Sequence, residues 1–357
     1  MTQQRIPQND LETELVASVV QAVASGTVLK ITGGGSKTFY GNPVEAQTLE
    51  VGMHTGVIDY DPAELVITLR SGCKLDHVEA LLAENNQMLG FEPLHLGDKA
   101  TIGGVLASGL AGPRRAYAGG VRDFILGVKL LSGRGEIMNF GGRVIKNVAG
   151  FDVSRLMVGA QGTLGIILEA SLRVIPQFET EQSLGFEHSN VESYIRWINQ
   201  LASKPLPLSA SSWYQGRSTI RLSGSQQGVD SAAANLGGTK ETGTWEQLRE
   251  QRHDFFTSSE KLFRLSLPQT REDLFPGQSQ LIEWGGAQRW LMGKYDLEQL
   301  RQTLESIGGT VCAYRGVDPE AQVFHPLNSS MLALHQSLKS SFDPAGIFNP
   351  GRLYREL

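Results

Sequence analysis

The stretch Ala100-Thr101-Ile102-Gly103-Gly104-Val105-Leu106-Ala107-Ser108-Gly109 places a capping residue and a glycine pair at the start of an apolar run. A threonine side chain accepts a hydrogen bond from the first turn of a helix, so Thr101 is expected to cap a short helix. Glycines let a ligand approach the backbone closely. Because a helix start carries free N–H donors and partial positive charge, this stretch predicts a contact with a pyrophosphate.

Three further glycine turns lie between residues 33 and 167. Gly33-Gly34-Gly35-Ser36-Lys37-Thr38 follows a strand expected over 28–32, and its N–H groups can converge on an anion. Gly119-Gly120-Val121-Arg122-Asp123 sets a cation beside a carboxylate, and Gly162-Thr163-Leu164-Gly165-Ile166-Ile167 leads into a strand expected over 165–174. The first loop taken alone is more often a tight turn. The four together favour a long, folded ligand that contains a pyrophosphate.

The first loop matches neither of two common nucleotide motifs. Ser36 separates Gly35 from Lys37 and the upstream glycine is misplaced, which excludes a P-loop. Thr38 stands where a dinucleotide fingerprint has its third glycine. The first loop is therefore expected to bind its ligand as neither a P-loop nor a dinucleotide fingerprint.

Composition excludes several classes of protein. The chain has 357 residues, of which 40% are hydrophobic and 19% charged, which predicts a globular protein of two or three domains. A net charge of −5 argues against a nucleic-acid binder. Cys73 and Cys312 lie far apart and are expected to be buried thiols, without a metal site. A polar N-terminus and the lack of an 18-residue apolar run predict a cytoplasmic protein without a leader or membrane span.

Periodicity predicts an α+β chain in three parts. Apolar residues recur at helical spacing from Leu11 to Val23, after the expected N-cap Asp10, and Gly26 ends the helix. Beyond Pro176 glycine becomes sparse and all five tryptophans occur. The expected domains are 1–176, a mixed α+β cap at 177–320, and a helix with an ordered tail at 321–357.

Five motifs, taken in order, resemble those of the FAD-linked oxidases of the vanillyl-alcohol oxidase / p-cresol methylhydroxylase superfamily. The resemblance implies an FAD-binding domain of two α+β subdomains, of the p-cresol methylhydroxylase type, with a cap domain and a C-terminal helix that returns to the FAD domain. The motifs are Ala100-Thr101-Ile102-Gly103-Gly104, Arg122-Asp123-Phe124-Ile125-Leu126-Gly127, Lys146-Asn147-Val148-Ala149-Gly150-Phe151-Asp152, Gly162-Thr163-Leu164-Gly165-Ile166-Ile167 and Asp343-Pro344-Ala345-Gly346-Ile347-Phe348-Asn349-Pro350-Gly351.

The resemblance also implies which residues bind FAD. Two loops would hold the pyrophosphate, a short stretch would lie along the flavin, one would contact the adenine end, and the tail would close over the isoalloxazine. Ser36 occupies the position at which some relatives attach FAD through a histidine, so FAD is expected to be non-covalent. The implied cofactor-binding residues are Gly33, Gly34, Gly35, Ser36, Lys37, Thr101, Gly103, Gly104, Ser108, Gly109, Asp123, Gly162, Thr163, Gly165, Ile166, Asn349 and Arg352.

Within the superfamily, two tracts resemble the FAD-binding subunits of bacterial glycolate oxidase. They are Gly109-Leu110-Ala111-Gly112-Pro113-Arg114-Arg115 and Leu281-Ile282-Glu283-Trp284-Gly285-Gly286-Ala287. This implies two partners, a second FAD-containing subunit and an iron–sulfur subunit, and a membrane association only through them. The chain has no cysteine cluster of its own for an iron–sulfur centre.

The chain departs from catalytic members of the family at the residues expected to do proton chemistry. Where they carry Glu-His-Gly, this sequence reads Tyr314-Arg315-Gly316, and their second histidine motif is absent. The catalytic base stays unassigned. The resemblance implies flavin electron transfer in the oxidation of glycolate to glyoxylate. Two alternatives stay open: a self-sufficient FAD-dependent dehydrogenase of D-lactate-like 2-hydroxyacids, and a non-catalytic structural flavoprotein subunit.

Overall fold

The computed structural model describes residues 6–142, 152–257, 260–316, 318 and 320–357. The chain forms two compact units. Unit 1 comprises Met1–Leu110, Gly120–Gln177 and Pro326–Leu357, and unit 2 comprises Ala111–Gly119 and Phe178–His325. Positions 146–151 of the third family motif lie outside the described residues.

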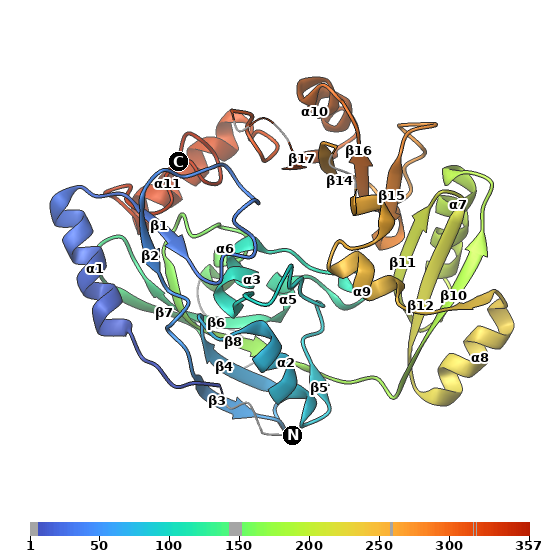
Figure 1. The fold of residues 1–357 in the computed structure, drawn as a ribbon, viewed down its shortest axis with the longest axis horizontal. Helices are drawn as coiled ribbons and strands as arrows, with labels where there is room; N and C mark the ends of the chain where they lie inside the picture. The colour runs from blue at the N-terminus through green and yellow to red at the C-terminus, as the bar shows by residue number, and fades with distance from the viewer. Residues whose placement is uncertain (1–5, 143–151, 258–259, 317, 319) are drawn as a thin grey trace. The chain divides into compact units, whose positions relative to one another are not determined.

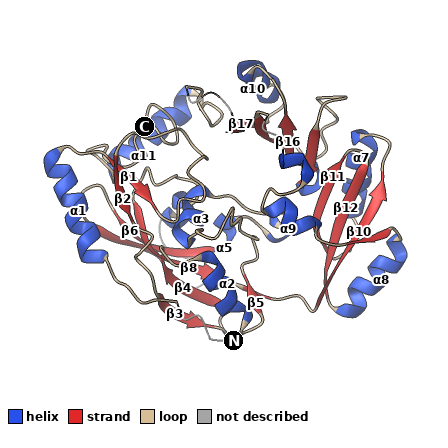
Figure 2. Cartoon of the chain, in the orientation of Figure 1, coloured by secondary structure: helices blue, strands red, loops and turns tan. Residues whose placement is uncertain are grey.

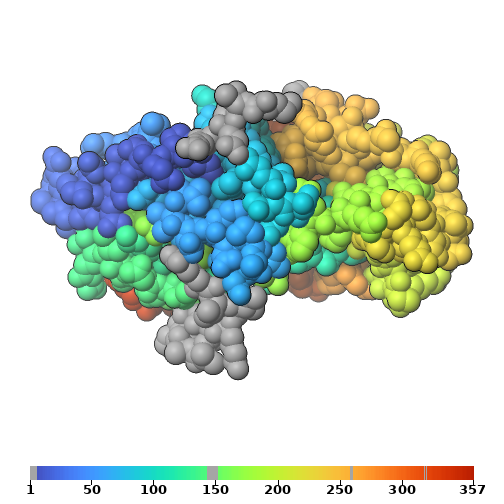
Figure 3. Space-filling model, turned by 90° about the horizontal axis from the view of Figure 1, so that it is seen from below, coloured from blue at the N-terminus to red at the C-terminus, as the bar shows by residue number. Residues whose placement is uncertain are grey.

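Unit 1 begins with a helix and two parallel strands: α1 (Glu12–Ser25), β1 (Leu29–Thr32) and β2 (Gln47–Glu50). One face of α1 is buried through Leu15, Val19 and Ala22, and Gly26 ends the helix with a φ of 67°. The helix starts one residue later than expected, because Leu11 is the N-cap. The outer face of α1 is exposed, and dark blue residues of this helix lie on the surface (Figure 3).

The centre of unit 1 is a five-stranded antiparallel sheet in the order β3-β4-β8-β6-β7. Short helices accompany it, and β5 pairs with β9 separately. The bounds are β3 Val57–Asp61, β4 Val66–Arg70, α2 Leu75–Ala83, β5 Gln87–Met88, α3 Ile102–Ser108, α5 Val121–Phe124, β6 Ile125–Leu131, β7 Ile137–Gly141, α6 Val153–Met157, β8 Ile166–Arg173 and β9 Ile175–Pro176.

The C-terminal segment is part of unit 1. Helix α11 (Ser329–Phe342) and the tail lie beside β1 and β2 (Figure 1). Leu29 N–H donates to Ile347 O at 2.7 Å, and Asn349 N–H donates to Leu29 O at 2.9 Å. Ile347 and Phe348 are fully buried in a core with residues of α1, β1 and β8. The tail therefore extends the edge of the strand that leads into the first glycine loop.

Unit 2 is built on an eight-stranded antiparallel sheet, ordered β13-β10-β12-β11-β15-β16-β14-β17. Helices α7 and α8 lie against β10, β11 and β12 (Figure 2), and α10 packs on β17. The bounds are α4 Arg115–Ala118, β10 Thr180–Glu187, α7 Val191–Ala202, β11 Leu208–Tyr214, β12 Arg217–Gly224, α8 Gln226–Leu236, β13 Thr239–Glu241, α9 Thr244–Arg249, η1 Asp254–Thr257, β14 Leu262–Ser266, β15 Gln280–Glu283, η2 Trp284–Gly286, β16 Gln288–Met292, α10 Leu297–Glu305 and β17 Thr310–Arg315.

The segment Ala111–Gly119 leaves unit 1 and packs within unit 2. Trp284 Nε1 donates to Gly112 O at 3.1 Å, and the Arg115 guanidinium lies 4.5 Å from the centre of the Trp284 ring. Tyr117 Oη donates to Ser211 Oγ at 3.0 Å. The two tracts that resemble glycolate oxidase subunits are therefore in direct contact. We call the segment Ala111–Gly119 the hook.

Arg114 is expected to be the strongest anchor of the hook. Its side chain is 5% exposed, donates to Glu181 Oε1 at 2.6 Å and to Ser223 Oγ at 3.3 Å, and lies over Phe178. Arg114→Ala should lower the free energy of unfolding by about 1–3 kcal/mol, because a buried, charge-assisted pair is lost. Urea unfolding measures this.

An exposed pair provides the matched control for Arg114. Arg155 pairs with Asp152 at 3.1 Å, with both side chains about half exposed. Arg155→Ala should change the stability by no more than about 1 kcal/mol. Equal losses in the two variants would contradict the anchoring role of Arg114.

Candidate functional site

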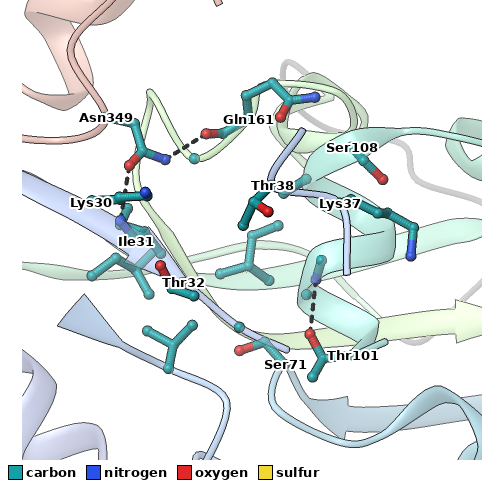
Figure 4. A pocket seen from close by; sticks show the side chains of 18 of the residues that line it. Lys30, Ile31, Thr32, Lys37, Thr38, Ser71, Thr101, Ser108, Gln161 and Asn349 are labelled. Carbon is teal, nitrogen blue, oxygen red and sulfur yellow. Dashed lines mark hydrogen bonds between the residues drawn. The ribbon is translucent and has the colours of Figure 1, made fainter. Parts of the chain in front are cut away.

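A cavity in unit 1 is formed where the end of β1, helix α3, the loop before β8 and the C-terminal tail meet (Figure 4). The cavity is open to solvent and has a volume of about 130 Å³. The lining residues are Lys30, Ile31, Thr32, Gly33, Gly34, Gly35, Ser36, Lys37, Thr38, Val44, Val51, Ser71, Thr101, Gly103, Gly104, Ala107, Ser108, Met157, Ala160, Gln161, Gly162, Gly165, Ile166, Ile167, Asn349 and Arg352.

The first wall of the cavity is the loop after β1, residues 33–37. A Cβ on Gly34 would overlap the carbonyl oxygen of Lys99, and one on Gly33 would lie 2.7 Å from Thr101 Oγ1. Within the described part of the chain, the N–H groups of Gly33 to Ser36 have no hydrogen-bond acceptor. These donors line the cavity, so the wall can bind an anion.

The second wall is the start of α3. Thr101 Oγ1 accepts from Gly104 N–H at 3.2 Å, which is the cap expected from the sequence. Gly103 N–H donates to Ser71 O at 2.7 Å, and a Cβ there would lie 2.8 Å from Ser71 Cβ. Among the described residues, a Cβ on Gly104 would meet Thr101 Oγ1 alone, at 3.3 Å. Gly103 is thus required by packing, whereas Gly104 leaves open space for a ligand.

The third wall joins the loop before β8 to the C-terminal tail. Asn349, at a left-handed φ of 41°, accepts at Oδ1 from Ile31 N–H at 2.9 Å and donates from Nδ2 to Gln161 O at 2.6 Å. Both bonds are drawn in Figure 4. A Cβ on Gly162 would lie 2.7 Å from Asn349 Nδ2. The Asn349 side chain therefore bridges two opposite edges of the cavity.

The charge of the lining favours an anionic ligand. It contains Lys30, Lys37 and Arg352, and no carboxylate among the lining residues that the structure describes. Lys37 Nζ donates to His95 O at 3.3 Å and to Ser36 Oγ at 3.2 Å. Arg352 donates to the carbonyls of residues 38, 40 and 42, and burial lowers its pKa to about 10. The Arg352 guanidinium is therefore still cationic at neutral pH.

The structure brings most of the predicted cofactor-binding residues to this cavity. Gly109, Asp123 and Thr163 are outside its lining. Gly109 ends α3 at a φ of 63°, the Asp123 carboxylate accepts from Gly120 N–H at 2.8 Å, and Thr163 Oγ1 donates to Ala160 O at 2.7 Å. The predicted residues in the lining are Gly33, Gly34, Gly35, Ser36, Lys37, Thr101, Gly103, Gly104, Ser108, Gly162, Gly165, Ile166, Asn349 and Arg352.

Sequence reasoning missed the apolar and amide parts of the lining. Val44, Val51 and Met157 come from segments without a glycine motif, and Gln161 is reached only through the fold. The combination of free N–H donors, cations and apolar side chains fits a ligand that has a diphosphate and flat, apolar rings. FAD has both features.

Comparison with known proteins supports the same class. Residues 9–141 match the model of a family described as "FAD binding domain". A solved alkyldihydroxyacetonephosphate synthase is similar in fold, with a TM-score of 0.66 and 17% identity, over 96% of this chain and 76% of that one. The chain is an FAD-dependent oxidoreductase with an FAD-binding fold of the p-cresol methylhydroxylase type.

Relatives of known name narrow the class. The chain is 44% identical to the glycolate oxidase subunit GlcE of Escherichia coli over 350 residues. The matched region covers 98% of this chain and 99% of that one. The chain therefore belongs to the family of GlcE-type glycolate oxidase subunits.

More distant relatives match only parts of the chain. Identity with the glycolate oxidase subunit GlcD of Bacillus subtilis is 31%, over 42% of this chain and 32% of that one. Identity with a D-lactate dehydrogenase of Anaerostipes hadrus is 32%, over 53% of this chain and 40% of that one.

The position that matches the family's Glu-His-Gly element is a packing site in unit 2. Tyr314 is buried, its Oη accepts from Gln251 Nε2 at 2.8 Å, and its ring meets Trp290 edge-on at 4.8 Å. Burial raises the pKa of Tyr314. Arg315 donates to Phe256 O at 2.9 Å. These residues hold β17 in place rather than presenting a base.

The two cysteines differ in burial. Cys73 is buried, and its Sγ accepts from Gly56 N–H at 3.1 Å. Cys312 is only half-buried in β17, so the expectation of a buried thiol was wrong there. The described residues contain no cluster of three or more metal-ligating side chains. In the same residues, no helix has the length and apolar character to span a membrane.

Proposed function

We propose that this chain is the FAD-binding subunit of a complex that oxidises glycolate to glyoxylate. The observation that carries the proposal is the 44% identity with GlcE over almost the full length of both chains. The cavity of unit 1 would hold FAD without a covalent bond, because Ser36 stands where some relatives have a linking histidine.

Each wall of the cavity has a proposed part in holding FAD. The loop 33–37 would bind the pyrophosphate through its N–H groups, and the start of α3 would leave room for it beside Gly104. Ser108 would lie along the flavin. The stretch 162–166 would contact the adenine end, and Asn349 and Arg352 would lie at the isoalloxazine. On this proposal domain 1–176 carries the cofactor, 177–320 is a cap or interface domain, and 321–357 completes the site.

The oxidation needs more than this cavity supplies. Glycolate loses a hydride from carbon and a proton from its hydroxyl, and a bound flavin provides a two-electron acceptor. A positioned base must take the proton. The side chain of Tyr314 is bound within unit 2, so we place the base in a second FAD-containing subunit, of the GlcD type.

Electrons would then pass to an iron–sulfur subunit. This chain has two cysteines, whereas a cluster needs about four ligands. Any membrane association would come through these partner subunits.

One observation favours the second candidate, a self-sufficient 2-hydroxyacid dehydrogenase. The chain shares 32% identity with a D-lactate dehydrogenase over 53% of its length. That similarity covers only 40% of the relative. Because the match with GlcE is much longer, the dehydrogenase is the second candidate.

Anaerobic flavin reduction separates the candidates. The purified chain, loaded with FAD, is mixed with glycolate or D-lactate, with and without GlcD-type and iron–sulfur partners, and absorbance near 450 nm is followed. Bleaching by glycolate only with the partners is the expected result. Bleaching by the chain alone would support the dehydrogenase. A chain that joins the complex but takes up no FAD would instead be a structural subunit.

A further inference from the structure

The side chain of the C-terminal helix that is buried in unit 1 is a charged one. Of the fourteen residues of α11, Lys339 is the buried one, at 7% exposed. Met331 and Leu334, on the same helix, are 42% and 52% exposed. A helix normally docks through an apolar face, so the contacts of Lys339 call for a specific reason.

The Lys339 ammonium uses all three of its donors on buried acceptors. Nζ donates to Thr163 O at 2.8 Å, to Asp343 Oδ2 at 2.7 Å and to Phe348 O at 2.7 Å. An ammonium has three N–H donors, so each is satisfied. Burial lowers the pKa of Lys339, and the neighbouring Asp343 carboxylate opposes that shift.

Asp343 orders the tail from the other side. Its carboxylate is 1% exposed and accepts from Ile347 N–H at 3.1 Å and Phe348 N–H at 2.8 Å. A Cβ on Gly133 would lie 2.8 Å from Asp343 Cα, so the turn after β6 closes tightly over this carboxylate. The pair thereby fixes the backbone that leads directly into Asn349.

The same pair reaches both edges of the cofactor cavity. The Thr163 carbonyl that Lys339 binds lies in the loop before β8, two residues after Gln161. The Phe348 carbonyl that it binds immediately precedes Asn349, whose side chain joins Ile31 N–H to Gln161 O. One ammonium thus fixes the spacing between the β1 edge and the β8 edge of the cavity.

We propose that Lys339 is a positioning residue for FAD: with Asp343 and Asn349 it forms a clamp that sets the width of the cavity on the side of the tail. The inference rests on the proposed assignment of this cavity as the FAD site. FAD binding by the folded protein, and the environment of the bound flavin, depend on the clamp.

The test measures FAD binding and stability separately. Lys339→Met and Asn349→Ala are titrated with FAD in the full chain, and the FAD-free proteins are unfolded in urea. At least a tenfold rise in Kd, about 1.4 kcal/mol, is expected for both variants, with a changed absorbance envelope of the flavin at saturation. Ser340→Ala, an exposed neighbour on α11, should bind as the parent does.

Two outcomes would overturn the clamp, and a third concerns the site itself. Lys339→Met that loses stability but keeps the parent Kd and flavin spectrum has a structural role only. Asn349→Ala, which leaves the ion pair intact, decides the question if Lys339→Met fails to fold: an unchanged Kd and spectrum would refute the clamp. Gly104→Val is run in the same series, and parent-like binding there would refute the cavity assignment rather than the clamp.

Discussion

Replacing Gly104 with valine is expected to abolish FAD binding while the protein stays folded. The Cβ of residue 104 has open space in front of it, with Thr101 Oγ1 at 3.3 Å as its nearest neighbour. A branched side chain there would occupy the space assigned to the pyrophosphate. We expect Kd for FAD to rise on the order of 100-fold or more, which corresponds to about 2.7 kcal/mol.

Stability should hardly change, because valine is a better helix former than glycine by a few tenths of a kcal/mol. Flavin fluorescence titration and urea unfolding of the FAD-free protein measure the two effects.

Gly228 provides a matched control for Gly104. It is also the third residue of a helix, α8, and its N–H donates to the capping Ser225 Oγ at 3.2 Å, as Gly104 N–H does to Thr101. Gly228→Val therefore makes the same local change in unit 2, and it should leave FAD binding unchanged. Full flavin occupancy in Gly104→Val would refute the assignment of the second wall.

The sequence predicted the fold of unit 1 well where glycine turns and strands coincide. The strands expected over 28–32 and 165–174 are β1 (Leu29–Thr32) and β8 (Ile166–Arg173), with no end shifted by more than one residue. The capping role of Thr101 was also correct. These features are local, since a cap or a glycine turn is decided by neighbouring residues.

Unit 2 was harder to predict because its signals are not local. The composition of the segment 211–222 predicts one strand, but the segment lies in a hairpin of β11 and β12, joined by Gln215 and Gly216 at φ of 48° and 83°. Glutamine is not a usual residue at positive φ, so the turn signal was limited to Gly216. Strand β16 has all five residues buried, which removes the alternation that marks a half-exposed strand.

The candidate site was also predictable only where its sequence signals are local. Glycine loops could be found from the sequence, whereas Lys30, Ser71 and Gln161 enter the cavity through strand pairing and the return of the tail. Asp123 was expected at the cofactor because of its motif, but its carboxylate binds Gly120 N–H in a local capping contact. Short polar side chains next to glycines often make such contacts with their own backbone, and sequence alone does not distinguish the two uses.

Replacing Gly34 with alanine is expected to damage both the fold of the cavity and its affinity for FAD. The added Cβ would overlap the carbonyl oxygen of Lys99 and lie 2.5 Å from its carbonyl carbon. Backbone cannot turn aside as a flexible side chain can, so the loop 33–37 must move away from residues 99–101. These two segments form the first and second walls, so the N–H donors of the loop would no longer face the space beside Gly104 that is assigned to the pyrophosphate.

The expected loss of stability for Gly34→Ala is about 1–3 kcal/mol, typical of overpacking. The expected rise in Kd for FAD is on the order of 100-fold, or about 2.7 kcal/mol. Urea unfolding without FAD and a fluorescence titration measure the two. Gly142→Ala, in the same unit and with no atom of the described residues within 4 Å of its added Cβ, is the control and should resemble the parent.

Comparing the two glycine variants distinguishes steric exclusion of FAD from displacement of the first wall. Gly104→Val should lose affinity alone, whereas Gly34→Ala should lose affinity and stability together, because its methyl group meets protein rather than cofactor. A Gly34→Ala protein as stable as the parent, with unchanged affinity, would show that the first loop does not pack on Lys99. That result would also contradict the proposal that the first and second walls together bind the diphosphate of FAD.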